Sequence, residues 1–360
     1  QEDLPQDVKF VKLFCGGKDY LELLPKRDAD EYRSLENKIK NTLKSYSICG
    51  YDPRGYCLDD LVGKTFIEDF FNLKNKAMEL AVKNFPEPKN YAQLEKIERL
   101  VYSISKRQLN LDLTNVYTAA NDNRIRKIIK RYSSSPAFIH YNTFGTVTGR
   151  LSTTPSSFPI LTLNKEYRTM ITPNNGVFIE FDYNAFELRV LTALLGREQP
   201  KGDIHDWNIK NIFEDGTSRS EAKQRIFAWL YNPNSNDKLL SEKYDRKGLL
   251  KKYFSDGKIV TDFDREIEAD DYHALNYLIQ STASDLFLEQ VYKVFKVLED
   301  NNCKSYVSML IHDSMILDFD RMDYKLLNQI KDAFKQTRYG DFKLNIQVGR
   351  TLGDLSAEWK

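Results

Sequence analysis

The sequence has few of the residues that build disulfide-linked or zinc-bound scaffolds. Its 360 residues include four cysteines, Cys15, Cys49, Cys57 and Cys303, and none of them forms a C-x-x-C pair or lies at a zinc-ligand spacing from a histidine. The sequence therefore argues against a disulfide framework and against a zinc site. We expect reduced thiols and an intracellular protein.

Long hydrophobic runs are also missing. No stretch approaches the ~18 consecutive apolar residues that a membrane helix needs, and the first residues lack the basic-then-apolar pattern of a signal peptide. We therefore expect a soluble protein with no membrane partner. Because the chain begins with Gln1, we also expect it to be a fragment or a processed product of a longer protein.

Neither sign of charge is in clear excess. The 53 basic and 52 acidic residues give a net charge of +1, with 41% apolar and 29% charged residues. The composition excludes wholesale disorder, and the charge balance argues against a protein that coats nucleic acid indiscriminately. A local basic field remains, because Arg124, Lys127 and Arg131 share one face of a predicted helix.

Periodicity predicts the order of the main elements. We expect a strand at 8–14, a helical region at 58–132 and a long helix at 272–298. Asn276, Gln280 and Ser284 would share one face of that long helix at four-residue spacing. A helical insert, 185–253, is predicted between two halves of one sheet.

Two aspartates stand at the ends of predicted strands. In the strand 177–182 the alternating apolar residues share one face, which leaves Asp182 on the other face at the strand's end. Asp313 lies at the tip of a predicted hairpin, 306–317. Two such carboxylates can hold Mg²⁺, which prefers oxygen ligands. Taken singly, each aspartate is more simply explained as a turn residue.

A stripe of four side chains follows one face of a further predicted helix. Arg219, Lys223, Phe227 and Tyr231 are spaced four residues apart, and four residues advance about 400° around a helix, so they stay in one stripe. Two cations can reach a triphosphate, and two aromatic rings can lie against sugar and base. The alternative is a helix with basic residues in solvent and aromatic residues in the core.

Six short motifs in fixed order resemble those of the family A DNA polymerases, the bacterial polymerase I type, over about residues 140–320. The motifs are T-G-R-L-S at 148–152, D-Y-N-A-F-E-L-R at 182–189 (motif A), G-D-I-H at 202–205, R-x-x-x-K-x-x-x-F-x-x-x-Y at 219–231 (motif B), N-x-x-x-Q-x-T-x-x-D at 276–285 and H-D-S at 312–314 (motif C).

The resemblance implies an α+β fold of right-hand shape. Its palm is an antiparallel sheet with helices, and its thumb and fingers are helical. We expect an N-terminal segment packing on the palm at 1–57, the thumb at 58–140, the palm at 141–192 and 273–360, and the fingers at 193–272.

The resemblance also implies template-directed DNA synthesis by two-metal-ion nucleotidyl transfer, with release of pyrophosphate. The expected partners of a monomeric enzyme are primer–template DNA and dNTPs. Two Mg²⁺ ions, for which Mn²⁺ can substitute, would be held by Asp182, Asp313 and the backbone carbonyl of Tyr183, with Lys223 as a further catalytic residue.

The same resemblance implies two sets of binding residues. Glu187 would block the space of a ribose 2′-hydroxyl and so select deoxynucleotides; alone, an acid in a first helical turn only favours the helix dipole. The nucleotide-binding set is Arg219, Lys223, Phe227, Tyr231, Glu187 and His205. The primer–template set is Arg150, Asn276, Gln280, His312, Arg124, Lys127 and Arg131.

Some positions depart from the family pattern. Ser314 stands where motif C usually has glutamate, Ala185 where glutamine is common, and Tyr272 where arginine often occurs. Two alternatives stay open: a single-subunit RNA polymerase, against which Glu187 argues, and a catalytically silent replication scaffold, for which Ser314 is the only hint. We expect no proofreading by this segment, since no D-x-E pattern precedes the predicted thumb.

Overall fold

The computed structural model of the protein shows two compact units, Gln1–Glu95 and Lys96–Lys360. The division falls inside the predicted thumb. The ranges predicted for the palm, fingers and thumb stay predictions, as does the packing of the N-terminal segment on the palm. The structure describes residues 8–51, 53, 56–119, 121–213, 216–232, 234–235 and 237–357.

The first unit is helical. Its two long helices, α2 (Lys26–Ile48) and α4 (Lys64–Asn84), pack against each other, and a small core forms around Leu24, Tyr32 and Ala77. The short elements are α1 (Val11–Phe14), η1 (Tyr20–Leu23) and α3 (Leu58–Leu61).

The strand predicted at 8–14 is wrong, because this segment holds the helical turn α1. Leu13, Phe14 and Cys15 are buried in succession, whereas a half-buried strand buries every second residue. Gly16 and Gly17 follow with φ of 58° and 80°, a left-handed backbone that glycine adopts readily and that turns the chain.

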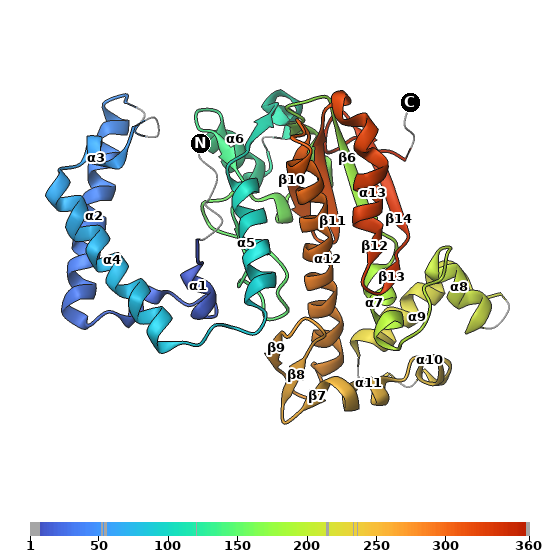
Figure 1. Ribbon diagram of the computed structural model, residues 1–360. Coiled ribbons are helices and arrows are strands. Elements are labelled where there is room, and N and C mark those ends of the chain that lie inside the picture. Colours follow the sequence, from blue (N-terminus) through green and yellow to red (C-terminus); the bar gives the residue numbers. More distant parts are fainter. Residues whose placement is uncertain are drawn as a thin grey trace. The chain divides into compact units, whose positions relative to one another are not determined.

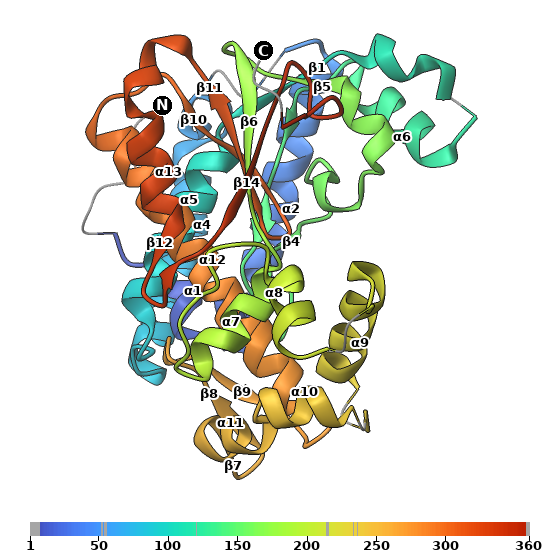
Figure 2. The ribbon, with the colours of Figure 1, turned by 90° about the vertical axis from the view of Figure 1, so that its right-hand side faces the viewer.

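A four-stranded antiparallel sheet forms the centre of the second unit, in the order β10-β11-β6-β14 (Figure 1 and Figure 2). Its strands are β6 (Val177–Tyr183), β10 (Tyr306–Ile311), β11 (Ser314–Phe319) and β14 (Leu344–Gly349). Strand β6 pairs with β11 although they are far apart in the sequence. The prediction of two sheet halves separated by an insert is confirmed.

Aromatic packing covers one face of this sheet. Phe181 and Tyr183 of β6 contact Phe334 of α13 (Leu327–Lys335), with ring centroids 6.1 and 4.5 Å apart. Helix α12 (Ala274–Asp300), which confirms the predicted long helix, contacts α13 and adds Phe287 to the same cluster. By strand alternation, the even-numbered side chains at the end of β6 face away from this core.

The predicted insert, 185–253, is helical, as expected. Its helices are α7 (Phe186–Leu194), α8 (Ile204–Asn211), α9 (Arg219–Tyr231), α10 (Lys238–Lys243) and α11 (Arg246–Tyr253). A small sheet follows, made of β7 (Phe254–Ser255), β8 (Lys258–Val260) and β9 (Glu266–Glu268). This sheet was not predicted, although Asp256-Gly257 is a strong hairpin signal.

Helices and short strands also precede β6. The predicted helical region 58–132 is largely helical but is interrupted by the strand β1. These elements are α5 (Tyr91–Ser105), β1 (Gln108–Leu111), η3 (Leu113–Ala119), α6 (Asn123–Tyr132), β2 (Ala137–Phe138), β3 (Tyr141–Asn142), β4 (Ser152–Thr153), η4 (Ile160–Thr162), η5 (Lys165–Met170) and β5 (Ile171–Thr172). Across the described ranges, no helix has the length and apolar character to cross a bilayer.

Candidate active site

The strand register brings the two predicted aspartates to the same end of the central sheet. Ser314, the first residue of β11, pairs directly with Asp182 in β6, and Asp313 immediately precedes it. His312 and Asp313 form the two-residue turn between β10 and β11, with His312 at a φ of 54°. Two carboxylates from distant parts of the chain therefore lie together.

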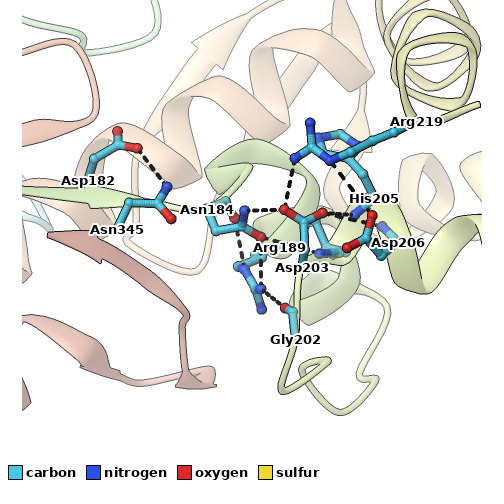
Figure 3. Close-up of polar contacts among 10 residues, drawn as sticks. Asp182, Asn184, Arg189, Gly202, Asp203, His205, Asp206, Arg219 and Asn345 are labelled. Carbon is cyan, nitrogen blue, oxygen red and sulfur yellow. Dashed lines mark hydrogen bonds and ion pairs between the residues drawn. The ribbon is translucent and has the colours of Figure 1, made fainter. Parts of the chain in front are cut away.

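Burial raises the pKa of both carboxyl groups. The pKa of Asp182 rises to about 6, and Glu180 and Asp313 add to this effect through charge repulsion. Asn345 Nδ2 opposes it by donating a 3.2 Å hydrogen bond to Asp182 Oδ2 (Figure 3). Burial also raises the pKa of Asp313, against the attraction of Arg150.

This donor set fits a hard divalent cation. The side-chain ligands on offer are carboxylate oxygens, the kind that Mg²⁺ and Mn²⁺ prefer, and a bound cation would offset the repulsion between Asp182 and Asp313. The side chain of Tyr183 is buried in the aromatic core. The predicted role of its backbone carbonyl as a metal ligand stays a prediction.

Glu187 connects three of the motifs. It lies in the first turn of α7, is 7% exposed, and accepts hydrogen bonds from Arg150 Nη2 on Oε1 and from the Tyr231 hydroxyl on Oε2. Burial raises the pKa of Glu187, while Tyr231 and Arg150 lower it and Asp313 raises it further. The T-G-R-L-S segment, motif A and the end of α9 thus meet beside Asp313.

Helix α9 carries the predicted stripe. Arg219 and Lys223 are exposed, and the half-buried rings of Phe227 and Tyr231 stack with centroids 5.7 Å apart and an interplanar angle of 3°. Lys223 Nζ lies 5.7 Å from the centre of the Phe227 ring. Other side chains of this helix supply its core contacts, namely Ala222, Ile226, Trp229 and Leu230.

Asp203, at the N-cap of α8, holds the first cation of this stripe (Figure 3). Its Oδ2 accepts hydrogen bonds of 2.8 Å from both Arg219 Nη2 and Asn184 Nδ2, and its Oδ1 accepts from the backbone N–H of His205 and Asp206. Burial raises the pKa of Asp203, but these hydrogen bonds lower it further and hold it well below its usual range.

Arg189 fixes the loop that carries Asp203 (Figure 3). Its fully buried guanidinium donates to the backbone oxygens of Asn184, Pro200 and Gly202, at 2.9, 3.0 and 2.7 Å. Because Pro200 and Gly202 lie in the segment that leads into α8, this arginine of motif A sets the position of the G-D-I-H segment.

Predicted residues on other elements are placed in different ways. His205 is 4% exposed, its ring centre lies 6.4 Å from that of Phe227, and burial lowers its pKa. Asn276 and Gln280 are half-buried on α12. Ser284, on the same helix, is buried and donates a 2.8 Å hydrogen bond to the Gly149 carbonyl.

Helix α6 has the predicted basic face and a buried apolar one. Ile125 and Ile128 are buried, whereas Arg124, Lys127 and Arg131 are exposed and line a cavity of about 300 Å³. An exposed stripe of three cations is suited to phosphate contacts. Their binding of DNA stays a prediction.

Sequence reasoning missed three polar residues near the aspartates. Asn345 of β14 pairs with Asp182 of β6, and Asn184 joins motif A to Asp203 through a hydrogen bond. Glu180 accepts a 2.8 Å hydrogen bond from Ser314 Oγ. Of these three, only Glu180 could have been found from the local sequence, because it stands two residues before Asp182 and therefore lies on the same face of the predicted strand.

Comparisons with known proteins show what the chain is similar to. No protein-family model matches the chain. It is 24% identical to DNA polymerase I of Borreliella burgdorferi over 318 residues, which covers 73% of this chain and 34% of the relative. It is 25% identical to the DNA polymerase of Bacillus phage SP01 over 291 residues, covering 59% and 31%. The chain spans about a third of the length of these curated relatives.

A solved structure is similar over most of the chain. It is the POL domain of Pol1 from M. smegmatis, in complex with DNA primer-template and dNTP. The match has a TM-score of 0.50 at 15% identity and covers 93% of this chain and 66% of the other. This likeness confirms the expected α+β fold.

Proposed function

Because this chain is a distant homologue of the polymerase domain of the family A, DNA polymerase I-type enzymes, we propose that it catalyses template-directed DNA synthesis. It would add dNMP units to a primer 3′-hydroxyl with release of pyrophosphate. The observation that carries the proposal is the register of β6 with β11, which sets Asp182 beside Asp313 at one end of the sheet.

The two aspartates would hold two Mg²⁺ ions, or Mn²⁺ in their place. Bound there, the ions would supply activation of the primer 3′-hydroxyl and neutralisation of charge on the leaving pyrophosphate. The sheet register and the tight β10–β11 turn hold the carboxylate oxygens of Asp182 and Asp313 in place. The Tyr183 carbonyl is a proposed further ligand.

The incoming dNTP would lie along the exposed stripe of α9. Arg219 and Lys223 would bind its triphosphate, and the stacked rings of Phe227 and Tyr231 would lie against its sugar and base. Glu187, held by Tyr231 and Arg150, would occupy the space of a 2′-hydroxyl.

The DNA would be held by residues from several elements. Arg150, Asn276, Gln280 and His312 would contact the primer–template near its growing end, where minor-groove acceptors are alike for every base pair. The exposed cations Arg124, Lys127 and Arg131 of α6 would contact phosphates, so that affinity falls with salt. In this proposal 193–272 are the fingers, 58–140 the thumb, and 141–192 with 273–360 the palm.

Primer extension tests the proposal directly. A 5′-labelled primer on a DNA template is incubated with Mg²⁺ and either dNTPs or NTPs, and Asp182→Ala serves as the control for contaminating polymerase. Extension with dNTPs only, absent in the control, supports a DNA polymerase. Extension with NTPs would indicate an RNA polymerase, and binding without extension would indicate a silent scaffold.

A further inference from the structure

Arg265 connects two of the six motifs, although it belongs to none of them. It ends the loop 261–265 between β8 and β9, and its side chain is 13% exposed. Its Nε and Nη2 donate hydrogen bonds to Oδ2 and Oδ1 of Asp285, at 2.8 and 2.6 Å. Asp285, the last residue of the N-x-x-x-Q-x-T-x-x-D motif on α12, is 1% exposed, so this two-point ion pair is buried.

The same guanidinium covers Gly149 of the T-G-R-L-S segment. A Cβ on Gly149 would lie 2.5 Å from Cζ, 2.6 Å from Nη2 and 2.9 Å from Nη1 of Arg265. Because the central carbon is the nearest of these three atoms, the guanidinium turns its flat face to the glycine. Only a residue without a side chain allows so close an approach.

Other contacts fix the same glycine. Ser284 of α12 donates its 2.8 Å hydrogen bond to the Gly149 carbonyl. Within the segment, the Gly149 N–H donates to the Thr146 carbonyl at 3.3 Å, and Thr146 Oγ1 donates to the Arg150 carbonyl at 2.9 Å. The residue that precedes Arg150 is therefore held by its own turn, by Ser284 and by the guanidinium of Arg265.

We propose that Arg265 is a positioning residue for Arg150 and, through it, for Glu187. This inference rests on the proposed function, in which Glu187 occupies the space of a 2′-hydroxyl. The side chain of Arg150 is 42% exposed and donates to Glu187 through Nη2, so its direction depends on where its backbone is held. By holding the preceding residue, Arg265 keeps Arg150 on Glu187 Oε1. Selection against ribose thus depends on a residue outside the six motifs.

A purely structural role for Arg265, the neutralisation of the buried Asp285, is the competing explanation. Such an ion pair needs no contact with Gly149, because it acts through the two charges alone. Buried ion pairs can often be replaced by apolar side chains of similar volume without loss of stability. Replacing both partners at once therefore separates charge neutralisation from the contact with the glycine.

The double variant Arg265→Met with Asp285→Leu makes this separation. It leaves no buried charge and should unfold in urea near the wild-type midpoint, but it offers Gly149 no guanidinium face. Hydrogen–deuterium exchange of the peptide 146–152, followed by mass spectrometry, should become faster. The ratio of ribonucleotide to deoxynucleotide kcat/KM should rise about fivefold. Arg265→Lys keeps the charge beside Asp285 without the flat guanidinium; it should show both changes at smaller size, and it serves if the double variant does not fold.

Glu289→Gln is the control for the loss of an ion pair on α12. Glu289 lies one turn beyond Asp285 and accepts a 2.6 Å hydrogen bond from Arg338 Nη2. This variant should leave both the exchange of 146–152 and the nucleotide ratio at their wild-type values. Wild-type exchange in both Arg265 variants would overturn the inference, and so would faster exchange with a wild-type ratio.

The two proposals fail in different ways. A wild-type chain that extends no primer would refute the polymerase activity, and the exchange of 146–152 would still decide whether Arg265 holds the turn before Arg150. A chain that extends primers with dNTPs, and whose Arg265 variants keep the wild-type exchange and ratio, would refute the positioning role alone.

Discussion

Arg219 Nη2 lies 2.8 Å from Asp203 Oδ2, so the first cation of the α9 stripe is held by the N-cap aspartate of α8 (Figure 3). Asp206 adds a weaker contact, 3.7 Å from Arg219 Nε. If Arg219 binds a triphosphate, it must exchange Asp203 for phosphate oxygens. Asp203 would keep its hydrogen bonds from Asn184 and the α8 backbone, so the loop would stay in place during the exchange.

Replacing Arg219 should therefore weaken nucleotide binding and leave DNA binding intact. A charge-assisted hydrogen bond contributes about 1.5–3 kcal/mol, so Arg219→Ala should raise KM for dNTP about tenfold or more. Steady-state extension kinetics measure KM, and a gel-shift titration measures primer–template affinity. Arg225→Ala is the matched control on the same helix, because Arg225 is engaged by Asp237. Equal KM values in the two variants would contradict a triphosphate contact by Arg219.

Loss of either aspartate should abolish synthesis. Asp182→Ala and Asp313→Ala each remove a proposed ligand to both ions, while the residues proposed to hold DNA remain. Primer extension under Mg²⁺ and under Mn²⁺ should show no product above background, and fluorescence anisotropy should show nearly wild-type binding of primer–template. Near-normal extension by either variant would remove the two-metal assignment.

Sugar selection should depend on the contact of Glu187 with Tyr231. Glu187→Ala opens the space of the 2′-hydroxyl and should raise ribonucleotide use relative to deoxynucleotide use by at least tenfold. Tyr231→Phe keeps the ring but removes the hydroxyl that donates to Glu187 Oε2, so it should raise the ratio less. The readout is the ratio of the two kcat/KM values. If neither variant changes it, the selection against ribose lies elsewhere.

The sequence predicted those parts of the site whose geometry is local. Alternation along 177–182 places Asp182 away from the core, and four-residue spacing places the stripe on one face of α9, because both follow from a single repeating backbone. The six motifs then assigned roles to these faces.

Contacts between elements could not be predicted in this way. Ser284 continues the four-residue pattern of Asn276 and Gln280, yet its hydroxyl is used by the Gly149 carbonyl, a partner 135 positions earlier in the chain. The pairing of Ser314 with Asp182, and hence its reach to Glu180, depends on a strand register that the sequence does not encode locally.

The T-G-R-L-S glycine should be required for stability. Gly149 has a φ of 75°, and a Cβ there would lie 2.5 Å from Arg265 Cζ. Arg265 donates to both carboxylate oxygens of the buried Asp285, at 2.8 and 2.6 Å. Gly149→Ala should displace this guanidinium and so weaken its pairing with Asp285. Asp285→Ala should lower the free energy of unfolding by about 3–5 kcal/mol, because it leaves the buried charge of Arg265 unpaired.

Urea unfolding followed by circular dichroism measures both effects. Gly196→Ala provides the control, because Gly196 also has a positive φ, 68°, but a Cβ there would meet no atom within 4 Å. Gly196→Ala should lower the free energy of unfolding only by the cost of a positive φ for a residue other than glycine, about 1 kcal/mol. Equal losses of unfolding free energy in Gly149→Ala and Gly196→Ala would show that the Arg265 side chain moves away from the added methyl group at no cost.

Discrimination at the 3′ position should depend on Phe227. Its ring lies parallel to that of Tyr231, beside Lys223, on the stripe proposed to face the nucleotide sugar. A phenylalanine there offers no hydroxyl to replace the hydrogen bond that a missing 3′-OH would have made. Because an unpaired buried polar group costs about 1–3 kcal/mol, one added hydroxyl can change discrimination about tenfold or more.

We therefore expect the wild type to reject dideoxynucleotides and Phe227→Tyr to accept them at least tenfold more readily. The measurement is the frequency of chain termination at matched dNTP and ddNTP concentrations, with Phe227→Leu as a control that keeps an apolar side chain and adds no hydroxyl. Since only the tyrosine variant supplies the donor, it alone should terminate often. Equal termination by all three proteins would mean that the α9 stripe does not face the sugar, and the proposed placement of the dNTP would be wrong.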